Sequence, residues 1–212
     1  LAIHGNHDAM LQGTVPPDIF LQEFSIGNSR VSKLRDDVDL TEIFSDYQMV
    51  GPASYPPLSV AILSEITADK SRAFIDSNEW INSHIECGHD HGIGIFNLQN
   101  KVRYWSKDFD NVRILALDTV NENGGWQGSI DQTQFEWLKK QLSESGPKYF
   151  ILLSHHPLET LFNDYEPDPN QRRICEGEIL DLLGTEPRVI LWLAGHTHTH
   201  KIEERRSAKT GN

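Results

Sequence analysis

The sequence predicts an α/β fold in which a layered β-sheet is flanked by helices. In the second half of the chain, short apolar strands alternate with amphipathic helices, an order that is typical of this class. The expected strands cover residues 102–106, 111–118, 148–153 and 188–194, and the expected helices cover residues 132–142 and 172–183. A turn at residues 107–110 joins the first two strands, so we expect them to pair antiparallel.

The helix expected over residues 132–142 has clear boundary signals. Asp131 and Gln134 stand three residues apart before an apolar face, which resembles the pattern of a capping box. Phe135, Leu138 and Leu142 lie on one side of such a helix, and Gly146 follows as a stop signal.

A long insertion is expected at about residues 12–100, between a strand stub at residues 1–3 and the regular second half. Within it, residues 12–27 are expected to be a loop, and residues 36–50 contain a helical face. A helix capped by Asp69 is expected over residues 71–84. Such insertions commonly roof an active site, and their loops often set specificity.

Length and charge limit the classes of function. A chain of 212 residues suits one domain, expected to span residues 1–212. The formal net charge of −12 argues against nucleic acid as a partner, because nucleic-acid binding needs a basic surface to replace phosphate counterions. No apolar run approaches the roughly 20 residues that span a bilayer, so no membrane span is expected. Compartment and oligomeric state stay open.

Three histidine-containing clusters stand at widely separated points of the chain. They are residues 5–8 (GNHD), 154–157 (SHHP) and 195–198 (GHTH). The second and third each follow a short apolar run, and the first follows the stub at residues 1–3. A buried strand that ends in polar side chains delivers them at its carboxyl end. Three strand ends that each carry Asn or His side chains therefore predict one metal site assembled across a sheet.

The GNHD, SHHP and GHTH clusters, in that order, resemble the motifs of the calcineurin-like metallophosphoesterases, from residue 1 to about residue 200. A narrower resemblance to an uncharacterised bacterial branch rests on residues 117–121, 124–129 and 155–160. The resemblance implies a layered β-sandwich with flanking helices. The family's Asp-x-His and Gly-Asp motifs, which precede GNHD, are lacking here, as are the strands after GHTH. We therefore expect a metallophosphoesterase-like fragment that is truncated at both ends.

The resemblance also implies a ligand set for two divalent or trivalent metal ions, Mn, Fe or Zn. Asn6, His155 and His196 match the family's ligands to one ion, and His198 matches a ligand of the other. Imidazole nitrogen and amide oxygen bind a cation without cancelling its charge, which leaves it able to activate water. Alternatively, each histidine is a loop residue whose side chain forms an ordinary hydrogen bond and binds no metal.

His7 matches a position that protonates the leaving-group oxygen in many family members, and Asp8 would orient and charge-stabilise it. Imidazole suits a general acid because its pKa lies near neutrality. The alternative for Asp8 is that it only fixes the loop.

Four further residues have open roles. His156 is a poor second ligand, because successive strand residues point to opposite sides; it either faces the substrate or is a structural neighbour. His89 and His91, in the insertion, either fold over the metals to bind the substrate's phosphoryl group, belong to a polar loop, or form an adventitious metal site. Trp126 stands either at the rim of the site or in the core or lid.

The predicted function is hydrolysis of a small phosphoester at a dinuclear metal centre, with a metal-bound hydroxide as nucleophile. The competing hypothesis is a non-catalytic binding scaffold of the same fold. In the family, the carboxylate that bridges the metals comes from the lacking motifs. We therefore expect residues 1–212 alone to be inactive. The substrate's identity stays open.

Overall fold

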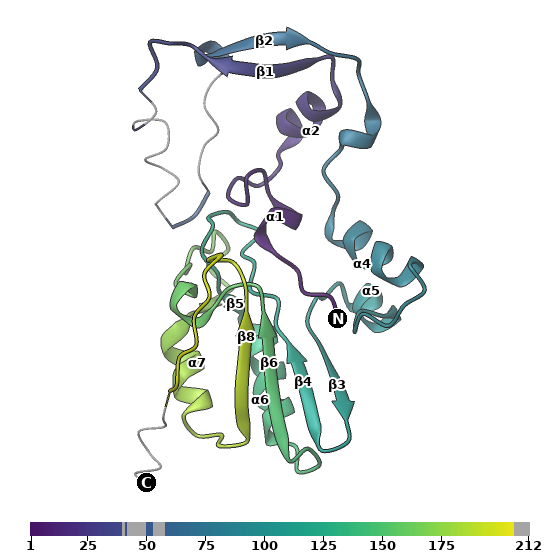
Figure 1. The fold of residues 1–212 in the computed structure, drawn as a ribbon, viewed down its shortest axis with the longest axis vertical. Helices are drawn as coiled ribbons and strands as arrows, with labels where there is room; N and C mark the ends of the chain where they lie inside the picture. Colours follow the sequence, from purple (N-terminus) through teal and green to yellow (C-terminus); the bar gives the residue numbers. More distant parts are fainter. Residues whose placement is uncertain (40, 42–49, 53–57, 206–212) are drawn as a thin grey trace.

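The computed structural model describes residues 1–39, 41, 50–52 and 58–205. Its main sheet has the strand order β3-β4-β6-β8, and is formed by β3 (Trp105–Phe109), β4 (Val112–Ala116), β6 (Tyr149–Ser154) and β8 (Val189–Ala194). β3 and β4 form an antiparallel hairpin, whereas β4, β6 and β8 run parallel. The three parallel strands therefore deliver their carboxyl ends to the same edge of the sheet (Figure 1).

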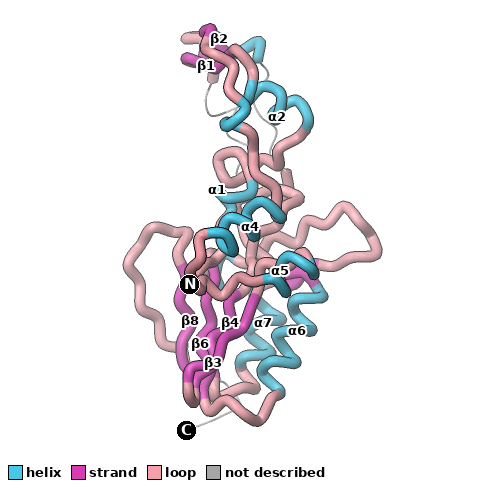
Figure 2. The backbone as a smooth tube through the Cα atoms, turned by 90° about the vertical axis from the view of Figure 1, so that its right-hand side faces the viewer, coloured by secondary structure: helices cyan, strands magenta, loops and turns pink. Residues whose placement is uncertain are grey.

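Two helices, α6 (Gln132–Ser143) and α7 (Glu176–Leu183), cover one face of this sheet (Figure 2). Asp131 caps α6 by accepting the amide hydrogen of Gln134 at 2.7 Å, so this helix begins where the sequence predicts. The side chain of Gln134 does not close a capping box. It bonds the backbone N–H and C=O of Asp118 instead, at 2.8 and 2.7 Å, and so ties α6 to the end of β4.

The core lies between the sheet and these helices. Strand and helix side chains that are almost completely buried fill it: Leu115, Leu138, Phe150, Leu152, Ile174 and Ile179. Each such side chain stabilises the fold by roughly 1.5–3 kcal/mol relative to leaving it exposed. This packing fixes where the parallel strands end.

The opposite face of the sheet is covered near its carboxyl edge by the first residues of the chain and by α4 (Ser77–Glu86). Trp80 and Ile81 of α4 pack with Ala2 against Trp105 and Ala116. Helix α5 (Ile95–Asn100) follows α4 on this side. The chain segment that leads into Asn6 is thereby held beside the ends of β4 and β6.

Part of the expected insertion forms an arm that extends away from the sheet (Figures 1 and 2). It contains α2 (Ile19–Ile26) and an antiparallel hairpin of β1 (Ser29–Leu34) and β2 (Ala61–Glu65). The short 3-10 turns η2 (Leu58–Val60) and η3 (Lys70–Arg72) flank β2. The hairpin lies at the far end of the molecule from the main sheet, so it does not contribute to that sheet.

The predicted α/β class with a helix-flanked sheet is confirmed. The described residues form one four-stranded sheet and two two-stranded sheets, so the second layer of the expected β-sandwich stays a prediction. The loop expected at residues 12–27 is wrong in part, because Asp18 caps α2 by accepting the amide hydrogen of Leu21 at 2.7 Å. The helical face expected within residues 36–50 falls mainly on residues outside the described ones.

Two predicted helix starts are wrong. The helix expected from residue 71 begins at Ser77, because Asp76 and Glu79 form the capping box there, whereas Asp69 caps only η3. The helix expected from residue 172 begins at Glu176, because β7 (Arg173–Ile174) pairs with β5 (Ile130–Asp131) and holds that segment extended. Among the helices of the described residues, none is long and apolar enough to cross a bilayer.

Candidate metal centre at the carboxyl edge of the sheet

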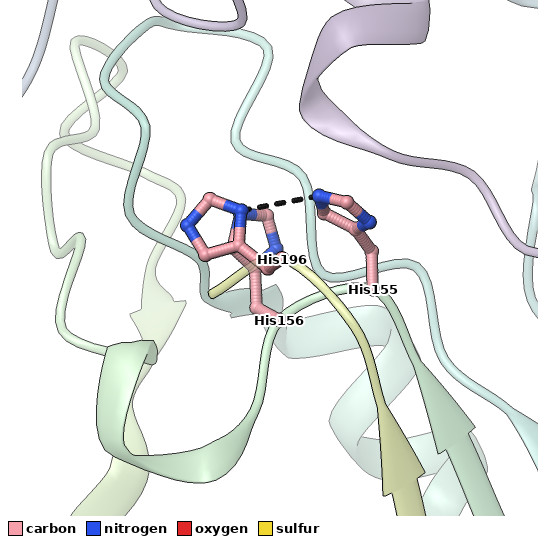
Figure 3. Close-up of side chains that lie close together, drawn as sticks. All are labelled: His155, His156 and His196. Carbon is pink, nitrogen blue, oxygen red and sulfur yellow. Dashed lines mark hydrogen bonds between the residues drawn. The ribbon is translucent and has the colours of Figure 1, made fainter. Parts of the chain in front are cut away.

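Three donor atoms from distant parts of the chain meet beyond the carboxyl ends of β6 and β8. His155 directly follows β6, His196 lies just past β8, and Asn6 begins the short helix α1 (Asn6–Ala9). The Nε2 atom of His155 lies 2.7 Å from Oδ1 of Asn6. The same atom lies 3.1 Å from Nδ1 of His196 (Figure 3). An amide oxygen and two imidazole nitrogens at such distances can share one transition-metal ion.

The orientation of the Asn6 amide is fixed by a second contact. Asn6 is buried, and its Nδ2 donates to the carbonyl oxygen of Gly13 at 2.9 Å, which leaves Oδ1 facing His155. Gly13 adopts a φ of +70°, and a Cβ placed there would lie 2.4 Å from Nδ2 of Asn6. No motif marks a glycine at this spacing from Asn6, so Gly13 could not be identified from the sequence.

The turn after β8 brings His196 back over His155. His196 and His198 have φ values of 66° and 52°, in the left-handed region that non-glycine residues rarely adopt. The amide hydrogen of Gly195 is donated to the carbonyl oxygen of His155 at 3.0 Å, which ties the two motifs together. His198 is exposed, and across the described residues no hydrogen bond or ring contact joins it to His155 or His196.

The electrostatics of the site favour neutral imidazoles. Burial, together with the electrostatic effect of His155, His198 and His7, lowers the pKa of His196 to about 4. Burial also lowers the pKa of His155, although the carboxylate of Asp8 opposes that shift. Both rings are therefore neutral at pH 7 and keep a lone pair available for a metal ion.

His156 is closer to the other two rings than the sequence analysis expected. Its ring centroid lies 4.3 Å from that of His196, and the candidate donor atoms of His155, His156 and His196 all lie within 4.8 Å of one another (Figure 3). Successive residues point to opposite sides only within a strand, and β6 ends at Ser154, so the backbone turns before His156. Sequence alone did not reveal where the strand would end.

Both ring nitrogens of His156 nevertheless have protein partners. Nδ1 lies 2.8 Å from Oγ1 of Thr119, and Nε2 donates to the carbonyl oxygen of Trp126 at 3.0 Å. The ring is completely buried, and burial lowers the pKa of His156 to about 3. Of the two roles that the sequence left open for His156, substrate contact and structural neighbour, these bonds favour the structural one. A metal ligand would also need a ring nitrogen without a protein partner.

His7 and Asp8 are exposed on α1, next to Asn6. The carboxylate of Asp8 accepts the amide hydrogen of Gly5 at 2.8 Å. This bond supports the alternative role of Asp8, in which it only fixes the loop. In the part of the chain that the structure describes, no hydrogen bond joins Asp8 to His7. The His7 ring borders Gly13, where an added Cβ would lie 2.9 Å from Nε2.

His89 and His91 lie beside the edge strand β3. Asp90, between them, forms an ion pair with Lys107 of β3, and a Cβ at Gly92 would meet the Trp105 ring at 2.4 Å. Strand β4 separates β3 from β6, the strand that leads to His155. The carbonyl oxygen of His91 accepts the amide hydrogen of Ala2 at 2.7 Å, which ties this loop to the segment before Asn6. Among the described residues, no hydrogen bond, ion pair or ring contact joins His89 or His91 to the three donors, so their role in substrate binding stays a prediction.

A buried ionic network supports the segment before Asn6, and the sequence analysis did not place it at the site. Nδ1 of His4 lies 3.3 Å from Oδ1 of Asp118, and Nε of Arg103 donates to the other carboxylate oxygen at 2.8 Å. Burial alone would raise the pKa of Asp118, but Arg103 and His4 hold it well below its ordinary value. The network anchors the chain two residues before Asn6 to the end of β4.

Comparison with known proteins adds two findings. The sequence profile described as "Calcineurin-like phosphoesterase" matches residues 1–200. A curated protein of Rhodococcus erythropolis (strain PR4 / NBRC 100887), named "Probable cyclic nucleotide phosphodiesterase", is 33% identical over 92 residues. Those residues make up 43% of this chain and only 29% of that relative, so the match covers less than a third of its length. No solved structure was found to match the chain.

Proposed function

Because this chain belongs to the calcineurin-like phosphoesterase family, we propose that it hydrolyses a small phosphoester at a dinuclear metal centre. Family membership supports metal-dependent phosphoester hydrolysis in general. The observation that carries the proposal for this chain is the convergence of Oδ1 of Asn6, Nε2 of His155 and Nδ1 of His196. Asn6 and His155 are 149 residues apart in the sequence, so local structure alone would not bring Oδ1 and Nε2 to within 2.7 Å.

The donor set fits a first-row transition metal. One amide oxygen and two neutral imidazoles suit Mn, Fe or Zn better than Mg or Ca, which prefer oxygen ligands. We assign Asn6, His155 and His196 to one ion and His198 to the other. Two ions held by these residues would lower the pKa of a bound water to about 7 and would stabilise the attacking and leaving oxygens.

Helix α1 would provide the residue that protonates the leaving group. The exposed imidazole of His7, next to the ligand Asn6, would donate its proton to the oxygen of the departing group. Asp8 would hold α1 in place through the amide of Gly5 rather than by contacting His7. Asn6 would stay aimed at its ion because Gly13 holds the other atom of its amide.

The relative's name places cyclic nucleotides among the phosphoesters that we would assay first. The chain matches a small share of that protein, so we extend to this chain only the general reaction and not that substrate. The inactivity that the sequence analysis expects for residues 1–212 alone also stays a prediction.

The test measures metal content and turnover together, on the full-length natural protein purified without chelator. We expect hydrolysis of an aryl phosphate in the presence of Mn²⁺, loss of turnover on exhaustive chelation, and recovery when Mn²⁺ is added back. His155→Ala should lose both metal and turnover, whereas His200→Ala, an exposed histidine after the GHTH motif, should keep both. Turnover that survives chelation contradicts the proposal. Metal binding without turnover supports the scaffold hypothesis.

A further inference from the structure

Trp126 lies against a proposed metal ligand in a geometry that leaves part of its face open. The Trp126 and His196 ring centroids are 5.7 Å apart, and their planes differ by 16°. Complete overlap of two parallel rings would bring their centroids to about 3.5–4 Å. The two rings are therefore nearly parallel but farther apart than fully stacked rings, and Trp126 is only partly buried.

The loop that carries Trp126 is held in place by buried polar groups. Nε2 of His156 donates to the Trp126 carbonyl oxygen at 3.0 Å. Nδ2 of Asn163 donates to the carbonyl oxygens of Gly124 and Gln127, at 2.7 and 3.2 Å. The indole is thus preorganised beside His196, and a preorganised surface loses little conformational freedom when a ligand binds.

Phe162 forms an aromatic corner with Trp126. Its ring stands at 89° to the Trp126 ring, with 5.9 Å between centroids, and the residue is 45% exposed. Its neighbour Leu161 is completely buried, so the backbone is fixed while the Phe162 side chain faces outward. A single exposed aromatic residue is ordinary. Two perpendicular aromatic rings beside a metal-binding histidine form a surface that suits a third planar ring.

We propose that Trp126 and Phe162 bind a planar aromatic arm of the substrate, so that the chain prefers phosphoesters of aryl or nucleobase-bearing alcohols. This rests on the proposed function, because it requires the phosphoryl group to bind at Asn6, His155 and His196. His196 is in contact with both the donor cluster and Trp126, so an arm attached to that phosphoryl group reaches the indole face. Stacking of this kind increases affinity by about tenfold.

The probes are phosphonates, whose carbon–phosphorus bond is not hydrolysed by a phosphoesterase. Isothermal titration of the metal-loaded full-length protein compares phenylphosphonate with methylphosphonate, which carry a phenyl and a methyl group on the same phosphonate. We expect phenylphosphonate to bind about tenfold more tightly. A phosphonate analogue of adenosine 5′-monophosphate, measured against the same analogue without its base, distinguishes a nucleobase arm from a simple aryl arm.

Variants then locate the preference. Trp126→Leu and Phe162→Leu should each reduce the phenyl preference to about threefold or less, with methylphosphonate affinity and metal content unchanged. Trp126→Phe should retain most of the preference, which separates loss of the ring from misfolding. The matched control is Phe109→Leu, because Phe109 is 46% exposed but lies on β3.

Equal affinity for the two phosphonates in the natural protein overturns the inference, and so does a preference that both leucine variants retain. A phenyl preference that depends on Trp126, in a protein without metal-dependent turnover, supports this binding surface while contradicting the proposed hydrolysis. The failures of the two proposals are thus distinguishable.

Discussion

The carbonyl oxygen of Gly13 accepts a hydrogen bond from Nδ2 of Asn6 at 2.9 Å, and this contact turns Oδ1 of the same amide toward His155. Gly13 has a positive φ and no room for a side chain. A loop residue that binds no ligand itself therefore sets the direction of a proposed metal ligand, as the outer partners of metal sites commonly do.

Gly13→Ala should weaken metal binding. Its Cβ would strain the backbone by about 1–2 kcal/mol and displace the Asn6 amide, so we expect a Kd for Mn²⁺ about 10–100-fold higher. Isothermal titration of the metal-free protein measures this. Gly146→Ala is the control, because a Cβ there meets nothing within 4 Å. Identical Mn²⁺ affinity in both variants would show that Gly13 does not orient Asn6.

Asp118 and Glu122 provide a matched pair for stability, because both carboxylates bind Arg103. Asp118 is almost completely buried, whereas the Glu122 side chain is 53% exposed. Removing one partner of a buried pair costs about 3–5 kcal/mol, and an exposed pair contributes about 0–1 kcal/mol. Asp118→Asn should therefore lower the free energy of unfolding far more than Glu122→Gln, as measured by urea denaturation at pH 7.

The same pair predicts a pH dependence. The pKa of Asp118 is lowered in the folded state, so its stabilising contribution is present above the unfolded value of about 3.9 and is lost as the pH falls toward the folded value. The difference in unfolding free energy between the natural protein and Asp118→Asn should thus shrink below about pH 4. A difference that stays constant from pH 7 to pH 3 would show that Asp118 is not held ionised by Arg103 and His4.

His7→Ala should slow turnover in a way that depends on the leaving group. An alkyl phosphate needs protonation of its departing oxygen, so kcat should fall by about 10²-fold or more, and 4-nitrophenyl phosphate should lose less than about tenfold. Metal content should be unchanged, which separates an acid from a ligand. His200→Ala serves as the control. Equal slowing for both substrates would mean that His7 does not act as the acid.

The sequence predicted those parts of the fold that local signals determine. Asp131 caps α6 at the expected residue, and the apolar run at residues 188–194 becomes β8. Long-range contacts decide the rest. Residues 173–174 read as helix, but pairing with β5 extends them. The hairpin of β1 and β2 joins segments on either side of residues 40–57, and no local turn signal marks it.

The candidate site shows the same division. Order and strand-end placement predicted that the three histidine-containing clusters meet at one site, and the family resemblance implied that Asn6, His155 and His196 are the donors. They could not predict that Gly13 would hold the Asn6 amide or that Thr119 would bond His156, because both contacts depend on how loops pack in space. Likewise, they could not predict that the loop of His89 and His91 would contact β3 through the ion pair of Asp90 with Lys107.

Anomalous diffraction from crystals of the full-length protein grown with Mn²⁺ tests the central claim most directly. We predict an anomalous peak about 2.0–2.3 Å from Oδ1 of Asn6, Nε2 of His155 and Nδ1 of His196, with a second peak near His198. Crystals of His155→Ala grown in the same way should lose the first peak. A difference map in which the three donors keep their direct 2.7 and 3.1 Å contacts, with no anomalous density between them, would contradict the account.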